Sequence, residues 1–448
     1  MNTLRTIQKL DDTTTEVGYV THLECLSCGE KYPLERLMKE QGTVLVNICY
    51  DVCMGPLDVK YDYSALKEIL TPEEVERRPN EFWKLKELLP VNEILVAKDR
   101  KFTPIIKSKV IGPELGIELY FKLDSNDENP TRSFKDRPVA LATNEALESG
   151  YDTVYVASTG NLAIATAYLS REVGINCRVY IPKTLGEVKK NAIRQYLKNP
   201  KDLIECDLSY DDTNVKSMND CDKVNEEELK KSGKKKTFVP NNSFRPYYKE
   251  GSKTSGTEIA LQLKGQIDPN ETINIVYPLG SGALLCSAYK GIEELRLLNL
   301  FNNPIRMWGV QPEVCSPIIG AIPKNEIIPL RNPQTIAKSI AIGNPGSGYQ
   351  ALNVIKNSNG GGWKVSEKEI FKGVLDLYFK EGIFSQFVGG VTLAGIIHGA
   401  KNGDIKKGSV VVANITGGGK GRVEDDLFYY SKQFGYEKEA NRLLEEVK

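Results

Sequence analysis

Short runs of β-branched and aromatic residues alternate with amphipathic segments over most of this chain. The runs occupy residues 118–122, 153–156, 177–181, 273–277, 307–310 and 409–413, and helical patterns such as residues 161–173 fall between them. Strands that alternate with helices over such a length predict βαβ units and largely parallel sheets, with ligands at the carboxyl ends of the strands. We therefore expect an α/β fold.

The pattern also predicts how the chain is divided. With 448 residues it is too long for one small core. Residues 1–60 form a polar, turn-rich head, and residues 61–100 form a helical connector in which Thr71 can cap a helix that starts at Pro72. Residues 101–448 form the main body, with a smaller inserted subdomain at about 145–245. Residues 209–236 carry little apolar pattern and are expected to form a solvated helix and loop.

Composition excludes several classes of function. The 59 basic residues balance the 59 acidic ones, which gives no field that favours nucleic acid or an anionic membrane as a partner. No apolar run reaches the ~20 residues of a membrane span, and the first residues lack the apolar core of a secretory signal, so we expect a cytoplasmic protein. His22 and His398 are the only histidines, which leaves almost no material for a histidine-based triad.

Four of the nine cysteines are grouped in the head. Cys25 and Cys28 form one close pair, and Cys49 and Cys53 form a second, wider one. Two such knuckles can place four thiolates around Zn²⁺, which can replace a hydrophobic core in a small segment. The pattern predicts a structural zinc ribbon or a ribbon that has lost its metal; four ordinary reduced thiols are the alternative. A catalytic zinc is not expected, because four ligands close the site.

Two loops after strands carry a lysine and a candidate anion site. Lys135 lies in the segment 129–138, at the expected start of a helix capped by Ser133, where nearby anions are favoured. A lysine there could attack an aldehyde and later serve as a base. The loop after the next strand offers hydroxyl, glycine and amide groups that could hold a carboxylate: Ser158, Thr159, Gly160 and Asn161. A plain strand-to-helix cap is the alternative for this loop.

Two further loops complete the pattern. The turn after residues 273–277 leads into a helix, and its backbone N–H groups could cradle a phosphate: Gly280, Ser281, Gly282, Ala283 and Leu284. Thr416 follows the last strand and precedes three glycines, and a hydroxyl there could bond a neutral ring nitrogen. Each loop alone is ambiguous, but a lysine, an anion loop, a phosphate loop and a hydroxyl together predict a pyridoxal-phosphate site.

These motifs resemble those of threonine synthases, which are fold-type II pyridoxal-phosphate enzymes. The matching segments follow in order: residues 129–137, 157–161, 242–254, 342–345, 381–384 and 414–417. The resemblance implies a two-domain fold like that of tryptophan synthase β, behind the zinc-ribbon-like head, and a homodimer. It also implies that Lys135 forms the Schiff base with pyridoxal 5'-phosphate, that Phe134 packs against the cofactor, and that Asn161 and Thr416 meet its ring hydroxyl and ring nitrogen. Ser158 and Thr159 would hold the substrate carboxylate.

The implied reaction converts a phosphorylated amino acid with loss of phosphate, and its leading form makes threonine from O-phosphohomoserine and water. A cysteate synthase-like β-replacement on O-phosphoserine, with sulfite or a thiol, is the alternative, because residues 416–419 resemble those enzymes. A non-catalytic interaction protein that kept the fold is a second alternative.

Several positions depart from the threonine synthase pattern. Arg132 and Pro138 stand where glycines are usual, the turn at residues 280–284 differs, and Gln386 stands where an acidic residue is common. Arg132 could pair with a substrate phosphate, sulfite or second carboxylate, or it could pair with a surface carboxylate instead. The other candidates for binding the substrate anion come from the segment 242–254: Asn242, Arg245 and Lys253.

Overall fold

The computed structural model describes residues 17–41, 44, 46–233, 235–239, 245–419 and 423–447. The chain divides into two compact units, the first made of Met1–Lys101 and Lys135–Ser252 and the second of Phe102–Phe134 and Lys253–Lys448. The chain therefore passes three times between the units, and Lys135 is the first residue after the second passage. The division into head, connector and body stays a prediction.

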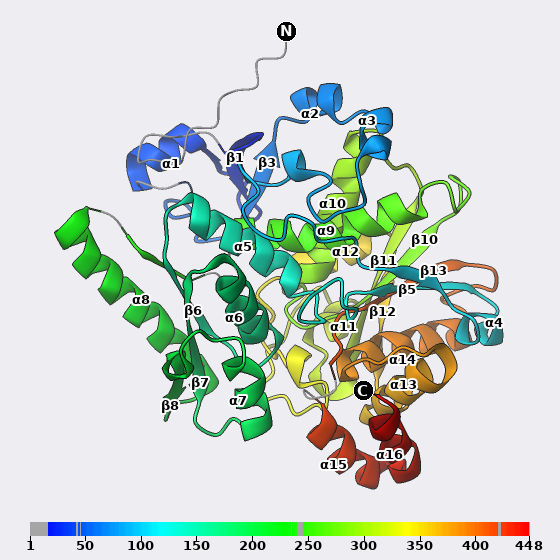
Figure 1. Cartoon of the computed structure of the whole chain (residues 1–448). Coiled ribbons are helices and arrows are strands. Elements are labelled where there is room, and N and C mark those ends of the chain that lie inside the picture. The colour runs from blue at the N-terminus through cyan, green and yellow to red at the C-terminus, as the bar shows by residue number, and fades with distance from the viewer. Residues whose placement is uncertain are drawn as a thin grey trace. The chain divides into compact units, whose positions relative to one another are not determined.

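The first unit begins with a small antiparallel sheet in the order β2-β1-β3 (Figure 1). Its strands are β1 (Val20–Cys25), β2 (Lys31–Pro33) and β3 (Leu57–Tyr61), and three short helices accompany it: α1 (Leu34–Gln41), α2 (Tyr63–Ile69) and α3 (Pro72–Arg77). The predicted cap of α3 is confirmed, since the Thr71 hydroxyl accepts a hydrogen bond from the N–H of Glu74 and Pro72 opens the helix.

A parallel sheet in the order β8-β7-β6-β9 forms the rest of the first unit. Its strands are β6 (Thr153–Ala157), β7 (Asn176–Pro182), β8 (Leu203–Cys206) and β9 (Thr237–Phe238). The helices are α5 (Asp136–Glu148), α6 (Asn161–Val173), α7 (Glu187–Arg194), α8 (Tyr210–Ser232) and the start of α9 (Pro246–Leu263).

Neighbouring side chains of strand β6 pack against different helices, which shows which helices cover each face of the sheet. Val154 and Val156 belong to the same apolar cluster as residues of α5 and α6, whereas Tyr155 and Ala157 share a second cluster with Cys221 of α8. Neighbouring side chains on a strand point to opposite faces, so α8 covers one face and α5 and α6 cover the other (Figure 1).

The second unit contains a six-stranded sheet in the order β12-β11-β10-β13-β5-β4, in which β4 alone runs antiparallel to its neighbour. Its strands are β4 (Ile105–Lys107), β5 (Glu118–Leu123), β10 (Ile273–Pro278), β11 (Ile305–Pro312), β12 (Gly361–Val365) and β13 (Val410–Ile415). Every residue of β10 and β13 is buried. Continuous β-branched runs are typical of parallel strands that are covered on both faces, so the sequence pattern identified these strands.

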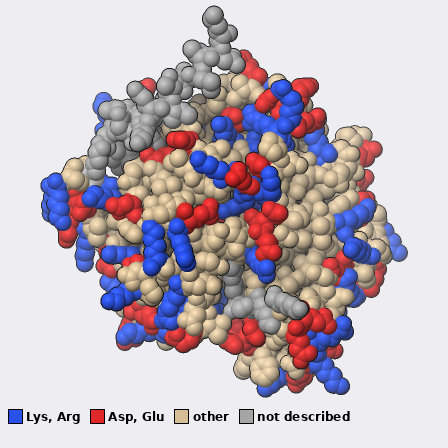
Figure 2. Space-filling view, in the orientation of Figure 1, with Lys and Arg blue, Asp and Glu red and all other residues tan. Residues whose placement is uncertain are grey.

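The helices of the second unit are α4 (Ile111–Leu115), the remainder of α9, α10 (Ala283–Leu297), α11 (Pro317–Ala321), α12 (Gly348–Asn357), α13 (Glu367–Glu381), α14 (Phe387–Asn402), α15 (Glu424–Phe434) and α16 (Glu437–Glu446). Within the described ranges, no helix is both long enough and apolar enough to cross a membrane. Figure 2 shows acidic and basic side chains interspersed on the visible face, in keeping with the balanced composition.

Candidate active site

In the first unit, Lys135 lies directly before helix α5 and is its N-terminal flanking residue. Its Nζ donates a hydrogen bond to the hydroxyl of Tyr248 over 3.2 Å. The side chain of Lys135 does not cap α5, and the backbone of Ser133 forms an antiparallel bridge with Gly417. The expected cap by Ser133 stays a prediction. The predicted position of Lys135 at a helix start is confirmed.

The loop from Ser158 to Asn161 joins β6 to α6 in the same unit. Gly160 flanks the helix, which starts at Asn161 as the pattern predicts, and the N–H of Gly160 donates to the Ser158 hydroxyl over 3.3 Å. Thr159, Gly160 and Asn161 are half-buried, and a Cβ built on Gly160 would meet no atom within 4 Å. The space beside Gly160 is therefore open, and N–H groups at a helix start favour an anion.

In the second unit, the predicted phosphate loop forms a tight turn between β10 and α10. Gly282 flanks the helix with φ of +86°, and a Cβ there would lie 2.9 Å from the Ala351 Cβ and 3.0 Å from the Ser347 carbonyl oxygen. Glycine is therefore required at this position by both conformation and space. The turn is held by the Ser347 N–H, which donates to the Ser281 carbonyl over 3.0 Å. The other members of the loop are half-buried: Gly280, Ser281, Ala283 and Leu284.

Thr416 follows β13 in the second unit and is 4% exposed. Its carbonyl accepts a hydrogen bond from the N–H of Phe134 over 2.9 Å, and the N–H of Gly418 donates to the Arg132 carbonyl over 2.8 Å. Residues 132–134 and 416–418 therefore lie side by side. The segment that carries Thr416 is held by the residues that immediately precede Lys135.

Gln386 also belongs to this region, although the sequence marks it only as a departure from the threonine synthase pattern. Its side-chain amide donates to the Gly418 carbonyl over 2.7 Å, and its backbone N–H donates to the Gly417 carbonyl over 2.9 Å. An ionised acidic residue has no donor with which to make the first of these bonds. A glutamine at position 386 can therefore bond the Gly418 carbonyl, which an ionised acidic side chain could not do.

Arg132 has a left-handed backbone with φ of +52°, a conformation that favours glycine. Its guanidinium pairs with Asp127; the Arg132 side chain is 43% exposed and that of Asp127 is 74% exposed. The alternative reading, a pair with a surface carboxylate, describes the side chain in this structure.

Two of the remaining candidates for the substrate anion are occupied within the fold. Lys253 is 1% exposed, and its Nζ lies 2.7 Å from a carboxylate oxygen of Glu294 on α10. The Arg245 guanidinium stacks at 4.0 Å over the ring of Phe238. Burial lowers the pKa of Arg245, against the opposing charge of the buried Glu145. Asn242 lies outside the described residues.

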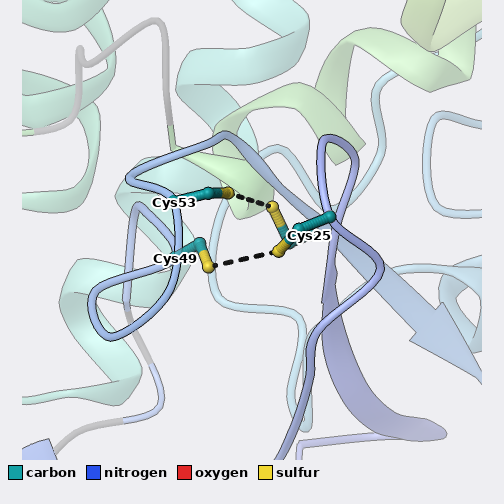
Figure 3. A group of neighbouring side chains, drawn as sticks. Cys25, Cys49 and Cys53 are labelled. Atoms are coloured by element: carbon teal, nitrogen blue, oxygen red, sulfur yellow. Dashed lines mark hydrogen bonds between the residues drawn. The ribbon is translucent and has the colours of Figure 1, made fainter.

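The four cysteines of the head converge (Figure 3). Their sulfur atoms all lie within 4.8 Å of one another, with Cys25 to Cys53 at 3.4 Å and Cys28 to Cys49 at 3.7 Å. Tetrahedral zinc with thiolates at about 2.3 Å requires sulfur separations of about 3.8 Å. The donor set therefore fits zinc and is compatible with the predicted ribbon.

A second layer of polar side chains supports this cluster. The Tyr32 hydroxyl lies 3.1 Å from the Cys49 sulfur and also bonds Asp51, which pairs with Arg36. Burial acts to raise the pKa of the Cys49 thiol, but hydrogen bonds from Tyr32 and from the backbone outweigh it and lower the pKa to about 6. Such partners orient metal ligands and favour the thiolate form.

Comparisons with known proteins relate this chain to pyridoxal-phosphate enzymes. Residues 96–417 match the model of the family described as "Pyridoxal-phosphate dependent enzyme". A threonine synthase of Methanosarcina acetivorans is 32% identical over 88% of this chain and 91% of its own length, and one of Methanocaldococcus jannaschii is 31% identical over the same shares. A fungal L-serine ammonia-lyase from Rhizomucor miehei has a similar fold, with a TM-score of 0.59 and 19% identity over 74% of this chain and 98% of its own.

These likenesses confirm the predicted fold class, in which a fold-type II body follows a four-cysteine head, and the predicted cofactor, pyridoxal phosphate. The matched region includes Lys135, the loop at Asn161, the turn at Gly282 and Thr416. On its fold, its motifs and its relatives, this chain belongs to the family of pyridoxal-phosphate dependent enzymes.

Proposed function

We propose that this enzyme acts on a phosphorylated amino acid with loss of phosphate, and that it converts O-phosphohomoserine and water to threonine. The observation that carries the proposal is the 32% identity to a threonine synthase over 88% of the chain. The position of Lys135 directly before α5 supports it, because nearby helix N–H groups favour the anions that a cofactor and substrate of this kind carry.

The first unit has the groups that the aldehyde and the acidic parts of the ligands need. Lys135 would anchor the cofactor through its amine, and Asn161 would donate to the ring hydroxyl. The open space beside Gly160 suits a carboxylate, since Gly160, which flanks the start of α6 at Asn161, has no side chain with which to cap the helix. Ser158 and Thr159 would hold the substrate carboxylate there.

The second unit has groups that suit a phosphate and a neutral ring nitrogen. Helix α10 is also flanked by a glycine, Gly282, which has no side chain to cap it, so the N–H groups of its first turn can bind the cofactor phosphate. A Thr416 hydroxyl can bond the ring nitrogen without protonating it, whereas a carboxylate would favour the charged ring. Phe134 would pack against the cofactor.

When bound, pyridoxal phosphate supplies an electron sink for carbanion chemistry. Lys135 would take the proton from the substrate α-carbon and return it, since it is the basic group that the motif places at the head of α5. The N-terminal turn of α6 would orient the carboxylate while the phosphate leaves and water adds.

Arg132 is our candidate for recognising the leaving phosphate. Because its pair with Asp127 is largely exposed, exchanging that carboxylate for a substrate phosphate costs little, on the order of 0–1 kcal/mol. Arg132→Ala should raise KM for the phosphorylated substrate, with Arg132→Lys as the control that keeps the charge. An unchanged KM in Arg132→Ala would remove Arg132 from the proposal.

Phosphate release from O-phosphohomoserine and from O-phosphoserine, with and without sulfite or a thiol, tests the reaction. We expect release from O-phosphohomoserine together with formation of threonine. Release from O-phosphoserine alone would replace the proposal with the β-replacement reaction that residues 416–419 suggest.

A visible absorbance band that borohydride removes tests whether Lys135 holds the cofactor. Lys135→Ala should lack the band, and Lys135→Arg should lack it as well, because a guanidinium keeps the charge but cannot bond the aldehyde. A wild-type protein without any such band would favour the non-catalytic alternative.

We also propose that Cys25, Cys28, Cys49 and Cys53 bind one structural zinc ion. Metal analysis of protein purified without chelator should find about one zinc per chain, as four thiolate ligands imply. Cys49→Ser should lose the metal, whereas Cys286→Ser, a change outside the cluster, should keep it. Metal-free wild-type protein would contradict the assignment.

The expected homodimer and the expected cytoplasmic location belong to the same proposal. The assembly follows from the resemblance, and light scattering that gives a mass of twice 49.9 kDa would support it. A monomer with full activity would remove the homodimer without affecting the proposed reaction.

A further inference from the structure

Tyr248 is a side chain that contacts the amine of Lys135 in the first unit. Its hydroxyl accepts the hydrogen bond from Nζ over 3.2 Å, and Nζ lies 5.6 Å from the centre of the Tyr248 ring. Tyr248 is 7% exposed and its ring belongs to the apolar cluster of the first unit, so the ring is fixed by packing. A hydroxyl on a fixed ring can hold a flexible lysine in one place.

A glycine contact between two helices sets this distance. Gly251 lies one turn after Tyr248 on α9, and a Cβ there would be 2.6 Å from the Cα of Pro138 and 2.7 Å from the Arg137 carbonyl oxygen. The backbones of α9 and α5 therefore touch without a side chain between them. Residues three apart share one face of a helix, so the same contact brings the Tyr248 hydroxyl to the start of α5.

This contact also explains how a proline is accommodated at position 138. Pro138 is in the first turn of α5, where its missing N–H costs nothing, and its Cα forms the surface on which Gly251 rests. The position departs from the usual glycine of threonine synthases, yet it is compatible with a close approach of α9. The change alters the contact surface beside Lys135 and leaves the helix start intact.

No histidine is needed to explain how Lys135 is held. Both histidines have other partners: His22 bonds the Thr21 hydroxyl, and His398 bonds Glu369. A tyrosine hydroxyl can accept a hydrogen bond from an ammonium and donate one to a neutral amine. It can therefore stay bonded to the lysine in both of the protonation states that proton transfer requires.

We propose that Tyr248 is the positioning residue of Lys135 and that the contact of Gly251 with Pro138 sets its distance. The inference rests on the proposed role of Lys135 as the cofactor lysine. The hydroxyl keeps the free amine at the head of α5, both before the cofactor is captured and when the lysine carries a proton during turnover.

Tyr248→Phe removes the hydroxyl and keeps the ring, and Tyr247→Phe is its matched control. Tyr247 is the preceding residue of α9, and its buried hydroxyl has no hydrogen-bond partner in the described part of the chain. The readout is the rate at which the cofactor-free protein captures pyridoxal phosphate, followed by absorbance and by borohydride-fixed label on Lys135. Melting temperatures of both variants report whether the fold is kept.

We expect Tyr248→Phe to slow capture about tenfold, the effect of losing about 1.4 kcal/mol, while Tyr247→Phe stays within about twofold of wild type. Turnover of O-phosphohomoserine should show a similar fall in kcat with little change in KM. Gly251→Ala, which displaces the helix and keeps the hydroxyl, should slow capture as well.

Capture at the wild-type rate in Tyr248→Phe would overturn the inference, as would equal slowing in both tyrosine variants, since that would reflect helix packing rather than the hydroxyl. Failure of the proposed function looks different. In that case the label on wild-type protein would lie on a residue other than Lys135, or no substrate would release phosphate, whatever stands at position 248.

Discussion

The buried ion pair between Lys122 and Glu258 offers a quantitative test of what holds the second unit together. Lys122 on β5 is 0% exposed, and its Nζ donates to Glu258 over 2.6 Å, to the Thr103 carbonyl over 2.7 Å and to the Gln262 side chain over 2.7 Å. All three donors of the ammonium are thus used. The Glu258 side chain, on α9, is 1% exposed and also accepts from Thr103.

Lys122→Met removes the charge and keeps most of the volume of the side chain. It leaves the Glu258 carboxylate buried without its cation, and breaking a buried pair in this way typically costs about 3–5 kcal/mol. Glu258→Leu should cost a similar amount, because it leaves the Lys122 ammonium buried without its anion. The double variant Lys122→Met/Glu258→Leu leaves no buried charge, so it should cost less than either single change and far less than their sum.

Urea unfolding measured by tryptophan fluorescence can follow the second unit by itself. Trp308 and Trp363 stack at 4.6 Å in that unit, and Trp83 is the third tryptophan, so a Trp83→Phe background isolates the signal. Costs below about 1 kcal/mol for both single changes, or a double variant that is additive, would refute the reasoning, because neither charge would then depend on the other.

Three further changes test other parts of the fold. Burial raises the pKa of Glu148 from 4.5 to about 7, so the stability that Glu148 contributes is full below pH 4.5 and is lost as the pH rises to 7. Chemical denaturation across pH should therefore find Glu148→Gln more stable than wild type by about 2 kcal/mol at pH 8 and little different at pH 4. For Glu369, burial acts to raise the pKa, but hydrogen bonds with His398 and Ser366 prevail and lower the pKa to about 2, so the stability that Glu369 contributes is present above pH 4.5 and is lost toward pH 2. Glu369→Gln should therefore cost about 1 kcal/mol at pH 6, discounted because the carboxylate is 43% exposed, and the cost should vanish near pH 2. A Cβ on Gly256 would lie 2.1 Å from a backbone carbonyl oxygen of α10, so Gly256→Ala should cost about 1–3 kcal/mol and lower the melting temperature, whereas Gly186→Ala, where no atom lies within 4 Å, should be close to neutral.

Local sequence pattern predicted the elements that position the candidate site. The runs at residues 153–156 and 409–413 became β6 and β13, and the helix expected at residues 161–173 has those bounds. These predictions succeeded because hydrophobic period and turn chemistry are properties of neighbouring residues. Short strands such as β9 and β12 were missed, since two to five residues carry little period.

For the candidate site, too, the sequence predicted some features and only the structure showed others. Position after a strand identified Lys135, Gly160 and Thr416 as chemistry-bearing residues, and the grouped cysteines predicted a cluster that the structure brings together. Charge and position in the motif could not show that Lys253 is already paired with Glu294 inside the fold. An ion pair depends on which helices pack together, and that information is not local.

The amino-acid sequence by itself determined the alternation of strands and helices, the lysine motif and the family to which the chain belongs. Only the tertiary structure decided which side chains surround that motif. Tyr248 reaches Lys135 across 113 residues of sequence because a glycine lets two helices touch, and Arg132 adopts a left-handed backbone beside the glycines that follow Thr416. Such contacts depend on the packing of distant segments, which no local pattern of residues encodes.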